Sequence, residues 1–401
     1  MSAGKSSYLP RSSTVFRARP RPVTWRLYWT LGFSLAVLPL LARAERRYRD
    51  LPLLPQQASA GRLPSLSIIV PARNEARNLR RLLPSLIEQE YPGPFEIIVV
   101  DDHSSDETAA VVREFMRREE ACLRLLPAAE LPDGWLGKPH ASHAGARAAT
   151  GEWLLFTDAD TIHTPVSAAS VVAFAEGHGL DGLSAFLQQE TDGWFNSAVL
   201  MVALAGLFAA QRRSDPVLNG QYFLVRRSVY EASGGFAAVR AEMMDDLAYG
   251  RHLAQQGYAA PIFRGEALAG VHMYENRRQM WHGINRLGSG SLRYSGPRAF
   301  VPALFVTGVL MPLWTLLFNR RYVRVMPRLW LVWTAAILGF VPWAKRFSER
   351  RSEGARARRR RQAVGTAVLA PAAALFVQLS ALWGMASRLL GRGISWKDRK
   401  V

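Results

Sequence analysis

The sequence predicts an α/β fold with a mostly parallel sheet of the Rossmann-like kind, joined to a set of apolar helices. Between residues 65 and 290, short apolar runs alternate with stretches of helical periodicity, which is typical of βαβ units. Outside this region, uncharged stretches lie beside clusters of arginine, as they do in membrane helices. With 49% hydrophobic residues among 401, the chain can bury a large core, which excludes disorder over most of its length. Cys122 is the single cysteine, so the composition excludes an internal disulfide and a cysteine-built zinc site.

The first 64 residues predict a basic tail at 1–22, a transmembrane helix at 23–43 and a linker at 44–64. The uncharged run Leu27–Ala42 is short for a span, but Arg26 and Arg43 can extend it by snorkelling. A cleavable signal peptide is the alternative, and the arginines that follow the run at once disfavour it. Three prolines and a glycine at 51–64 indicate irregular chain.

The region 65–290 predicts a single catalytic domain built from strands and helices in alternation. The apolar runs Leu66–Val70, Phe95–Val100 and Trp153–Thr157 have the length and composition of buried strands. Helical patterns over Ala76–Gln89 and Asp106–Arg118 separate them. Ligands of such sheets bind beyond the carboxyl ends of the strands, so we expect the site there.

The region 299–388 predicts further transmembrane helices, followed by a tail at 389–401. The candidates are Ala299–Phe318, Leu329–Ala344 and Gln362–Ser387, with buried core helices as the alternative. The number of membrane crossings stays open. If Ala299–Phe318 and Leu329–Ala344 both span, the basic loop 320–328 and the more basic segment 345–361 lie on opposite sides of the membrane, so both cannot be on the cytoplasmic side.

Gly193–Gln211 is also uncharged, yet acidic motifs lie on both sides of it in the sequence. A single crossing would place these motifs on opposite faces of a bilayer. We therefore expect the segment to lie in the membrane interface or over the site, without spanning. A plain core helix is the alternative.

The formal net charge is +19, and its arginines cluster beside the apolar stretches. This pattern favours anionic lipid head groups and the cytoplasmic side of a membrane. A nucleic-acid partner is disfavoured, because no basic and aromatic stacking pattern or known reader motif accompanies the charge.

Each of the three strand ends leads into charged residues. Val70 precedes Arg73 and Glu75, Val100 precedes an acidic run that includes Asp102, and Phe156 precedes Asp158 and Asp160. Acids that converge on one sheet edge repel each other and need a counter-charge. Mg²⁺ or Mn²⁺ fits, since these ions take carboxylate oxygens together with substrate phosphates. Asp158 and Asp160 are two residues apart, so at an extended strand end they would project to the same side.

These motifs resemble family 2 glycosyltransferases of the GT-A fold. The resemblance rests on Ser67–Glu75, Val99–Asp106, Phe156–Asp160, Asn219–Arg227, Gly234–Gly235 and Met244–Leu247, and covers about 220 residues. Gly134–Lys138 and Gly393–Lys397 also resemble the membrane-anchored bacterial branch that glycosylates carotenoids, hopanoids or related lipids.

The resemblance implies a role for each matching residue. Pro71, Arg73 and Glu75 would border the nucleotide, Asp102 the base, and Asp158 the ribose. Asp160 would bind the metal, and Asp246 would be the general base that deprotonates the acceptor as it attacks, with inversion. Asp245 stands where the family has Glu, so its side chain has a shorter reach.

Lys138 has an argument of its own. Five of the 51 basic residues are lysines, and Lys138 is the single lysine between Lys5 and Lys345. A compact ammonium suits a phosphate, so we expect Lys138 to contact the nucleotide-sugar donor. Chance retention on a solvated loop is the alternative.

Four further residues belong to the expected site. His272 replaces an Arg of this branch and is expected as a metal ligand, with a diphosphate contact or a structural histidine as the alternatives. Gly220, Gln221 and Trp281 are expected on the acceptor side with Asp245, although a tryptophan at such a place is as often core. The stretch 278–283 lacks the Gln-x-x-Arg-Trp motif of processive synthases, which argues for one sugar per acceptor.

The sequence thus predicts a metal-dependent, multi-pass glycosyltransferase of the inner membrane, with its catalytic domain in the cytoplasm. The donor would be a nucleotide-sugar, most simply a UDP-sugar, and the acceptor a membrane lipid such as a carotenoid, hopanoid or glycerolipid. A polyprenyl-phosphate or polysaccharide glycosyltransferase is the alternative within the fold. A non-catalytic scaffold or transporter is the alternative of another class, and the intact acids argue against it.

Overall fold

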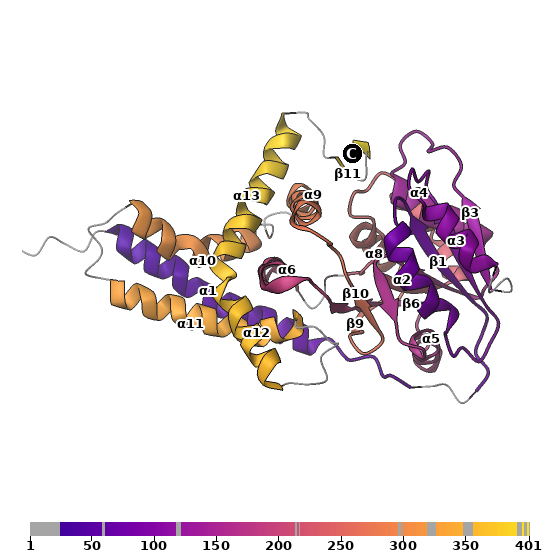
Figure 1. Ribbon diagram of the computed structural model, residues 1–401, viewed down its shortest axis with the longest axis horizontal. Helices are drawn as coiled ribbons and strands as arrows, with labels where there is room; N and C mark the ends of the chain where they lie inside the picture. Colours follow the sequence, from indigo (N-terminus) through magenta and orange to yellow (C-terminus); the bar gives the residue numbers. More distant parts are fainter. Residues whose placement is uncertain are drawn as a thin grey trace, which may run out of the picture.

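The computed structural model describes residues 25–57, 61–117, 122–212, 215, 217–295, 298, 300–318, 326–347, 356–390, 395–396 and 399–400. The expected basic tail at 1–22 lies outside these residues, as does most of the expected tail at 389–401. Figure 1 shows two parts, an α/β domain and a group of helices beside it.

The α/β domain alternates strands and helices over its first half and becomes less regular after β4. Its elements are β1 (Leu66–Ala72), α2 (Ala76–Ile87), β2 (Phe95–Asp101), α3 (Thr108–Met116), β3 (Leu123–Pro127), α4 (Gly137–Ala148), β4 (Trp153–Thr157), β5 (Thr161–His163), α5 (Ser167–Gly177), β6 (Gly182–Phe186), β7 (Gln188–Gln189), β8 (Tyr222–Arg226), α7 (Arg227–Ala232), the 3₁₀ helix η1 (Gly235–Val239), α8 (Asp245–Gln255), β9 (Ile262–Arg264) and β10 (Ala269–Val271).

Seven strands form the main sheet, in the order β3-β2-β1-β4-β8-β6-β9. The strands β3, β2, β1 and β4 are parallel, and β8 runs antiparallel to both of its neighbours. A second, three-stranded sheet has the order β5-β10-β7. The α/β class and the mostly parallel sheet that the sequence predicts are confirmed, and the antiparallel β8 marks where simple βαβ winding ends.

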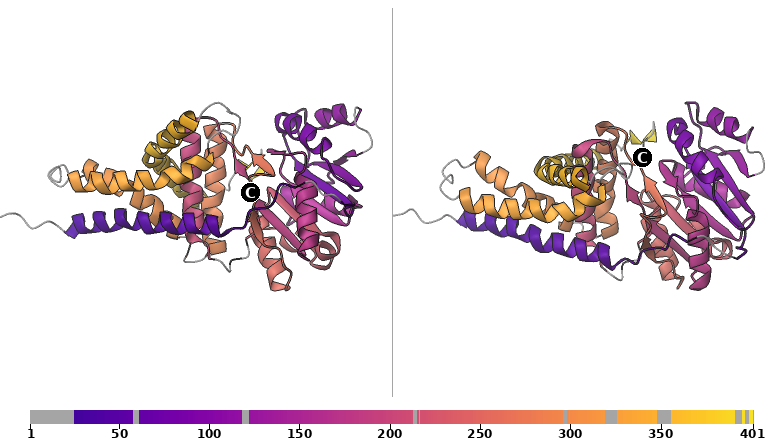
Figure 2. Two further views of the ribbon diagram at one scale, coloured as in Figure 1. Left: turned by 90° about the horizontal axis from the view of Figure 1, so that it is seen from below. Right: turned by 60° about the horizontal axis from the view of Figure 1, so that its bottom comes forward.

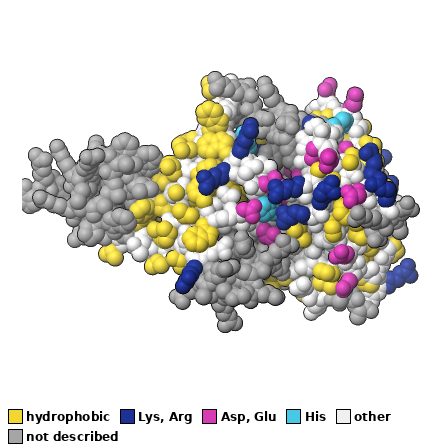
Figure 3. Space-filling view, viewed as in Figure 1, with side chains coloured by type: hydrophobic (Ala, Val, Ile, Leu, Met, Phe, Trp, Pro, Cys, Tyr) yellow, Lys and Arg dark blue, Asp and Glu magenta, His cyan; other side chains and the backbone are white. Residues whose placement is uncertain are grey.

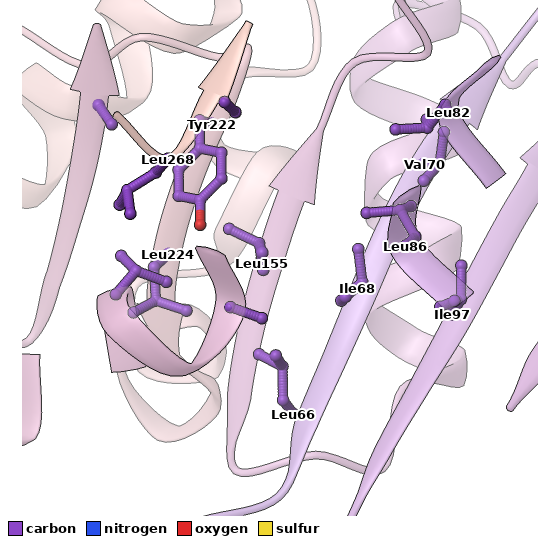
Figure 4. Close-up of a cluster of buried hydrophobic side chains, with 14 of the residues drawn as sticks. Leu66, Ile68, Val70, Leu82, Leu86, Ile97, Leu155, Tyr222, Leu224 and Leu268 are labelled. Atoms are coloured by element: carbon purple, nitrogen blue, oxygen red, sulfur yellow. The ribbon is translucent and has the colours of Figure 1, made fainter. Parts of the chain in front are cut away.

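Buried aliphatic side chains explain why these elements form. In α2, Leu79, Leu82, Leu83 and Leu86 recur at helical spacing and are buried against the sheet. Strand β1 is buried on both faces, as expected for a central parallel strand covered by helices. Figure 4 shows part of this core, where leucines of α2 meet side chains of β1 and β2.

The helical part contains α1 (Trp25–Asp50), α6 (Gly193–Ala210), α9 (Arg277–Ser295), α10 (Phe300–Phe318), α11 (Met326–Ala344), α12 (Arg356–Val368) and α13 (Ala370–Leu389), with the short 3₁₀ helix η4 (Lys345–Phe347) and the two-residue strands β11 (Ser395–Trp396) and β12 (Arg399–Lys400). All seven of these α-helices contribute to a hydrophobic core of their own, to which α6 supplies Ala198, Met201, Ala205 and Phe208. The helix α6 thus belongs to the helical core, although it lies within the sequence of the α/β domain.

The helices run in two directions. In Figures 1 and 2, α1, α10 and α11 extend away from the α/β domain, whereas α6 and α9 lie across them, next to that domain. Among the described helices, α6 and α13 contain 18-residue apolar stretches long enough to cross a bilayer, and the apolar parts of α10 and α11, Phe300–Met311 and Trp333–Ala344, are shorter. The described residues of the expected segments 23–43 and 299–388 are helical, and the relation of these helices to a membrane stays a prediction.

Candidate functional site

The three acidic strand ends lie side by side. Strand β1 pairs with β2 through Ala72 and Asp101, and with β4 through Ile69 and Phe156. Because these strands are parallel neighbours, their carboxyl ends meet at one edge of the sheet. The sequence-based expectation of a shared edge is met for these three strands.

The loops after β1 and β2 brace each other. The guanidinium of Arg73 donates to the main-chain carbonyl of Asp102 at 2.7 Å and to that of His103 at 3.3 Å. Ser105 donates its main-chain N–H to the Asn74 side chain at 2.8 Å. Both loops pass through the left-handed region, with φ of 53° at Asn74 and 56° at His103. Asp102 is 4% exposed between them, so its carboxylate occupies a fixed place.

Pro71 and Glu75 frame the β1 end of this edge. Pro71 lines the pocket described below. Glu75 precedes α2, its main-chain N–H donates to Thr108 Oγ1 at 2.8 Å, and its carboxylate accepts from Asn78 at 2.7 Å. The start of α2 is thereby tied to the start of α3.

Asp158 faces Lys138. The Lys138 Nζ atom, at the start of α4, is 2.6 Å from Asp158 Oδ1. Strand β4 ends at Thr157, and Asp158–Asp160 forms a turn that Thr161 closes by donating its N–H to the Asp158 carbonyl at 3.3 Å. Asp158 and Asp160 therefore do not lie on an extended strand end as expected, because a turn replaces the alternation of a strand there.

Asp160 lies beside His272 and the start of α6. The main-chain N–H of His272 donates to the Asp160 carbonyl at 2.9 Å. Its ring Nε2 is 3.2 Å from Oδ2 of Asp192, the residue before α6. The ring Nδ1 is buried and has no hydrogen-bond partner among the described residues. A carboxylate on one ring nitrogen fixes the other as a lone-pair donor, which is the usual arrangement behind a metal-ligating histidine.

Asp246 sits at the first turn of α8, against Gly220. Its Oδ2 accepts from the main-chain N–H of Gly220 at 3.1 Å, and its Oδ1 accepts from that of Leu247 at 2.8 Å. A Cβ at Gly220 would lie 3.1 Å from the Asp246 Cβ, so only glycine allows this approach without displacement. Asp245 and Asp246 both lie in the first turn of α8, where the helix N-terminus favours negative charge.

The charges of this edge perturb one another. Burial opposes the charge on Lys138, but Asp158, Asp245 and Asp246 outweigh it and raise the pKa of the ammonium above its ordinary value. Asp245 is 8% exposed. Burial raises the pKa of Asp245 to about 6, with Lys138 opposing and Asp246 and Asp158 adding to the rise. The Lys138 ammonium thus pairs with Asp158 and acts electrostatically on Asp245 and Asp246.

These residues line one pocket. Its walls are Pro71, Lys138, Ser142, Phe156, Thr157, Asp158, Leu218, Gly220, Phe223, Phe236, Asp245, Asp246 and Tyr249. Six sequence-predicted site residues are among them. Trp281 lies elsewhere, with its ring edge-on to Phe376 of α13 at 5.3 Å. Gln221 contributes its carbonyl, which accepts the Thr157 hydroxyl at 3.1 Å.

Within the described part of the chain, no group of three or more His, Cys, Asp or Glu side chains lies close enough to hold a metal alone. This does not exclude Mg²⁺ or Mn²⁺, which commonly bind one or two protein ligands and complete their shell with substrate phosphates and water. Asp160 and His272 fit such a partial set.

Arg286 of α9 and His163 of β5 are functional candidates that the sequence pattern does not reveal. Arg286 acts electrostatically on Asp245, whose pKa it lowers against the effect of burial, and on Tyr274. Neither residue belongs to a motif with a recognisable spacing. Their proximity to the site depends on how α9 and the second sheet pack.

The family model for glycosyl transferase family 2 matches residues 67–247. The chain is 26% identical over 293 residues to a 4,4'-diaponeurosporenoate glycosyltransferase of Staphylococcus aureus (strain USA300), spanning 68% of this chain and 75% of the relative. The protein of the same name from strain MRSA252 is 27% identical over 224 residues, 53% of this chain and 57% of the relative. Among solved structures, a mannosyltransferase from Pyrobaculum calidifontis in complex with GDP-Man and Mn²⁺ matches with a TM-score of 0.51 at 20% identity, covering 89% of this chain and 98% of that one. This last likeness shows the fold.

Proposed function

We propose, from the premise that the chain belongs to the family 2 glycosyltransferases, that it transfers one sugar with inversion from a nucleotide-sugar to a membrane lipid. The observation that carries the proposal is the pocket in which Lys138 and Asp158 from the donor side face Asp245 and Asp246. In such a pocket, the Lys138 ammonium can bind the diphosphate of the donor, and the Asp246 carboxylate beside it can take the proton of the acceptor.

Asp246 is the proposed general base. Two main-chain N–H groups hold its carboxylate, and the N-terminus of α8 favours its anionic form. An anionic, oriented carboxylate can take the proton of an attacking hydroxyl on the face opposite the leaving diphosphate. A single displacement of this kind inverts the anomeric configuration and needs no protein nucleophile.

The donor would lie along the edge formed by β2, β1 and β4. Asp102, Arg73 and Glu75 sit at the far end of this edge and would border the base and ribose with Pro71. Asp158 would contact the ribose. Lys138 would then meet the diphosphate, whose negative charge can replace the carboxylate that the ammonium holds in this structure.

The family implies a divalent metal, and the residues present fit one. Asp160 and His272 would hold Mg²⁺ or Mn²⁺, with Asp192 orienting the histidine ring. When bound, the ion supplies Lewis-acid stabilisation of the leaving diphosphate. The Pyrobaculum calidifontis structure, which contains Mn²⁺, supports this assignment at the level of the fold.

The outer surface of the helical part supports a lipid environment. Among the residues whose side chains the structure describes, nearly all exposed large hydrophobic ones lie on these helices, for example Phe300, Leu331, Leu338, Leu382 and Trp383. Figure 3 shows the contrast on one face, with apolar side chains over the helices and charged ones over the α/β domain. A contiguous apolar surface of this kind is typical of a membrane contact. Since α6 crosses α1, α10 and α11, both groups cannot run along the bilayer normal, and we propose that α6 lies in the interface.

The acceptor would approach from this side, past Gly220, Gln221 and Asp245. The Staphylococcus aureus relatives are named for diaponeurosporenoate, which supports an extended apolar acceptor. A carboxylate acceptor is a second candidate that this name favours. It would need no general base, and this difference distinguishes it from a hydroxyl acceptor.

The decisive experiment incubates membranes containing the protein with labelled UDP- and GDP-sugars and identifies the labelled product by mass spectrometry. We expect one sugar on an apolar lipid, in a glycosidic bond of inverted configuration. Label in polymer or in acid-labile lipid phosphate would favour the polysaccharide or polyprenyl-phosphate alternative. Absence of turnover with every donor would favour a non-catalytic membrane protein.

A further inference from the structure

His163 is a buried histidine directly beneath the pocket. It ends β5, is 6% exposed, and its ring stacks on that of Tyr222 at 5.4 Å. Burial lowers the pKa of the imidazole to about 3, so the ring is neutral at physiological pH. The proposed reaction gives this residue no task.

Three polar side chains meet at this point. The Nε2 atom of His163 is 3.1 Å from both Thr157 Oγ1 and Thr161 Oγ1, which are 2.9 Å from each other. Each hydroxyl also reaches a main-chain carbonyl. Thr157 donates to Gln221 at 3.1 Å, and Thr161 donates to Asp158 at 2.8 Å.

The surroundings of the two ring nitrogens decide the tautomer. A neutral imidazole carries one N–H, and a buried N–H without an acceptor is costly. Two hydroxyl oxygens able to accept lie 3.1 Å from Nε2, so the ring proton belongs on Nε2. The Nδ1 atom has no hydrogen-bond partner among the described residues, as suits a lone pair in an apolar place.

We infer that His163 is a positioning residue which, as the Nε2–H tautomer, locks the Asp158–Asp160 turn to the Gly220–Gln221 turn. One turn carries the donor-side acids, and the other holds Asp246 through the Gly220 N–H. The pairing of β4 with β8 already joins the two halves of the site, and the buried cluster of Thr157, Thr161 and His163 adds a side-chain connection between the two turns. The positioning role in catalysis rests on the proposed function, whereas the tautomer of His163 rests only on the contacts of its ring.

Three variants of the full-length protein separate the effect of the hydrogen-bond donor at Nε2 from the effect of the ring's shape. His163→Phe keeps a flat ring against Tyr222 and removes both nitrogens. His163→Asn places an amide at the Nδ1 position, whereas His163→Gln places one at the Nε2 position. We expect the affinity for UDP or GDP with Mn²⁺ and the kcat each to fall on the order of tenfold in the Phe and Asn variants, and the Gln variant to restore both. Equal behaviour of Asn and Gln would overturn the inference.

Nitrogen-15 NMR of histidine-labelled wild-type protein tests the tautomer directly. The His163 signal is assigned by its loss in whichever of the three variants folds, or without a variant by nuclear Overhauser contacts between its ring and that of Tyr222, on which it stacks. We expect a protonated Nε2 and an unprotonated Nδ1 from pH 5 to 8. An Nδ1–H tautomer or an imidazolium would overturn the inference. If wild-type protein binds neither nucleotide, the proposed function fails, and the NMR result still decides the tautomer.

Discussion

The Gly220 main-chain N–H donates to Oδ2 of Asp246 at 3.1 Å, and no side chain at position 220 could fit at this approach without moving the carboxylate. The turn before β8 therefore sets the position of the proposed base. Residues that are 26 apart in the sequence act as one unit.

Replacing Asp246 with Asn tests the base directly. The amide keeps the size of the side chain but cannot accept the acceptor's proton, so we expect kcat to fall by about 10²–10⁴ while nucleotide binding persists. The measurement is sugar transfer together with nucleotide affinity by calorimetry. Glu88→Gln, an exposed charge change at the end of α2, is the control and should leave both unchanged. Equal loss of nucleotide binding would show that Asp246 serves the donor, and unchanged turnover would point to a carboxylate acceptor.

Gly220→Ala should displace Asp246 without unfolding the protein. The added Cβ lies 3.1 Å from the Asp246 Cβ, so the carboxylate must shift by a few tenths of an ångström. We expect kcat to fall roughly tenfold, since proton transfer depends on hydrogen-bond geometry, with little change in Tm. Gly177→Ala at the end of α5, where the Cβ meets nothing within 4 Å, is the matched control. Wild-type kcat in Gly220→Ala would contradict the assigned contact.

Lys138→Met should weaken nucleotide binding at least tenfold. Methionine lacks the ammonium that pairs with Asp158, acts electrostatically on Asp245 and Asp246, and would meet the diphosphate. Lys138→Arg should recover part of the affinity, since the charge is kept but its shape differs. Titration with UDP and GDP measures the effect, and Arg113→Met on the exposed side of α3 controls for the loss of one cation. A Lys138→Met protein with wild-type affinity would exclude the proposed phosphate contact.

Divalent metal should bind with the nucleotide through Asp160 and His272. We expect Asp160→Ala to lose both activity and metal dependence, and Asp192→Asn to weaken Mn²⁺ binding on the order of tenfold or more by freeing the His272 ring. Electron paramagnetic resonance of Mn²⁺ in the presence of UDP or GDP reports binding independently of turnover. Full turnover in the presence of a chelator would refute the assignment.

Asp245 should make stability depend on pH between about 4 and about 6. Burial raises its pKa to about 6 in the folded protein, so in this window the folded state binds a proton that the unfolded chain has released. Stability of the wild type should therefore fall relative to Asp245→Asn as the pH rises through the window, by on the order of 1–3 kcal/mol. Chemical denaturation of both proteins at pH 4.5 and 7 measures this difference. A constant difference would mean that Asp245 titrates normally.

Much of this arrangement could be predicted from the sequence. Apolar runs place β1, β2 and β4, and the charged residues that follow them identify the sheet edge without coordinates. Asp158–Asp160 was harder, because a strand pattern does not reveal where the strand gives way to a turn. His163 and Arg286 could not be found, since a three-residue strand has no periodicity and the position of α9 depends on packing against α13. Trp281 is expected on the acceptor side, but its ring packs against Phe376 of α13, in the interface between two helices. An aromatic residue near a motif in the sequence can thus belong to a helix interface.

The helix α6 interrupts the catalytic segment, yet it is buried among α1, α10 and α13. Cutting the chain at 65 and 290, as its sequence motifs invite, would keep this helix and discard those that shelter it. The isolated fragment would expose the apolar surface of α6 to water and would aggregate. Anyone wishing to purify the enzymatic part must therefore retain the flanking helices or redesign the surface of α6.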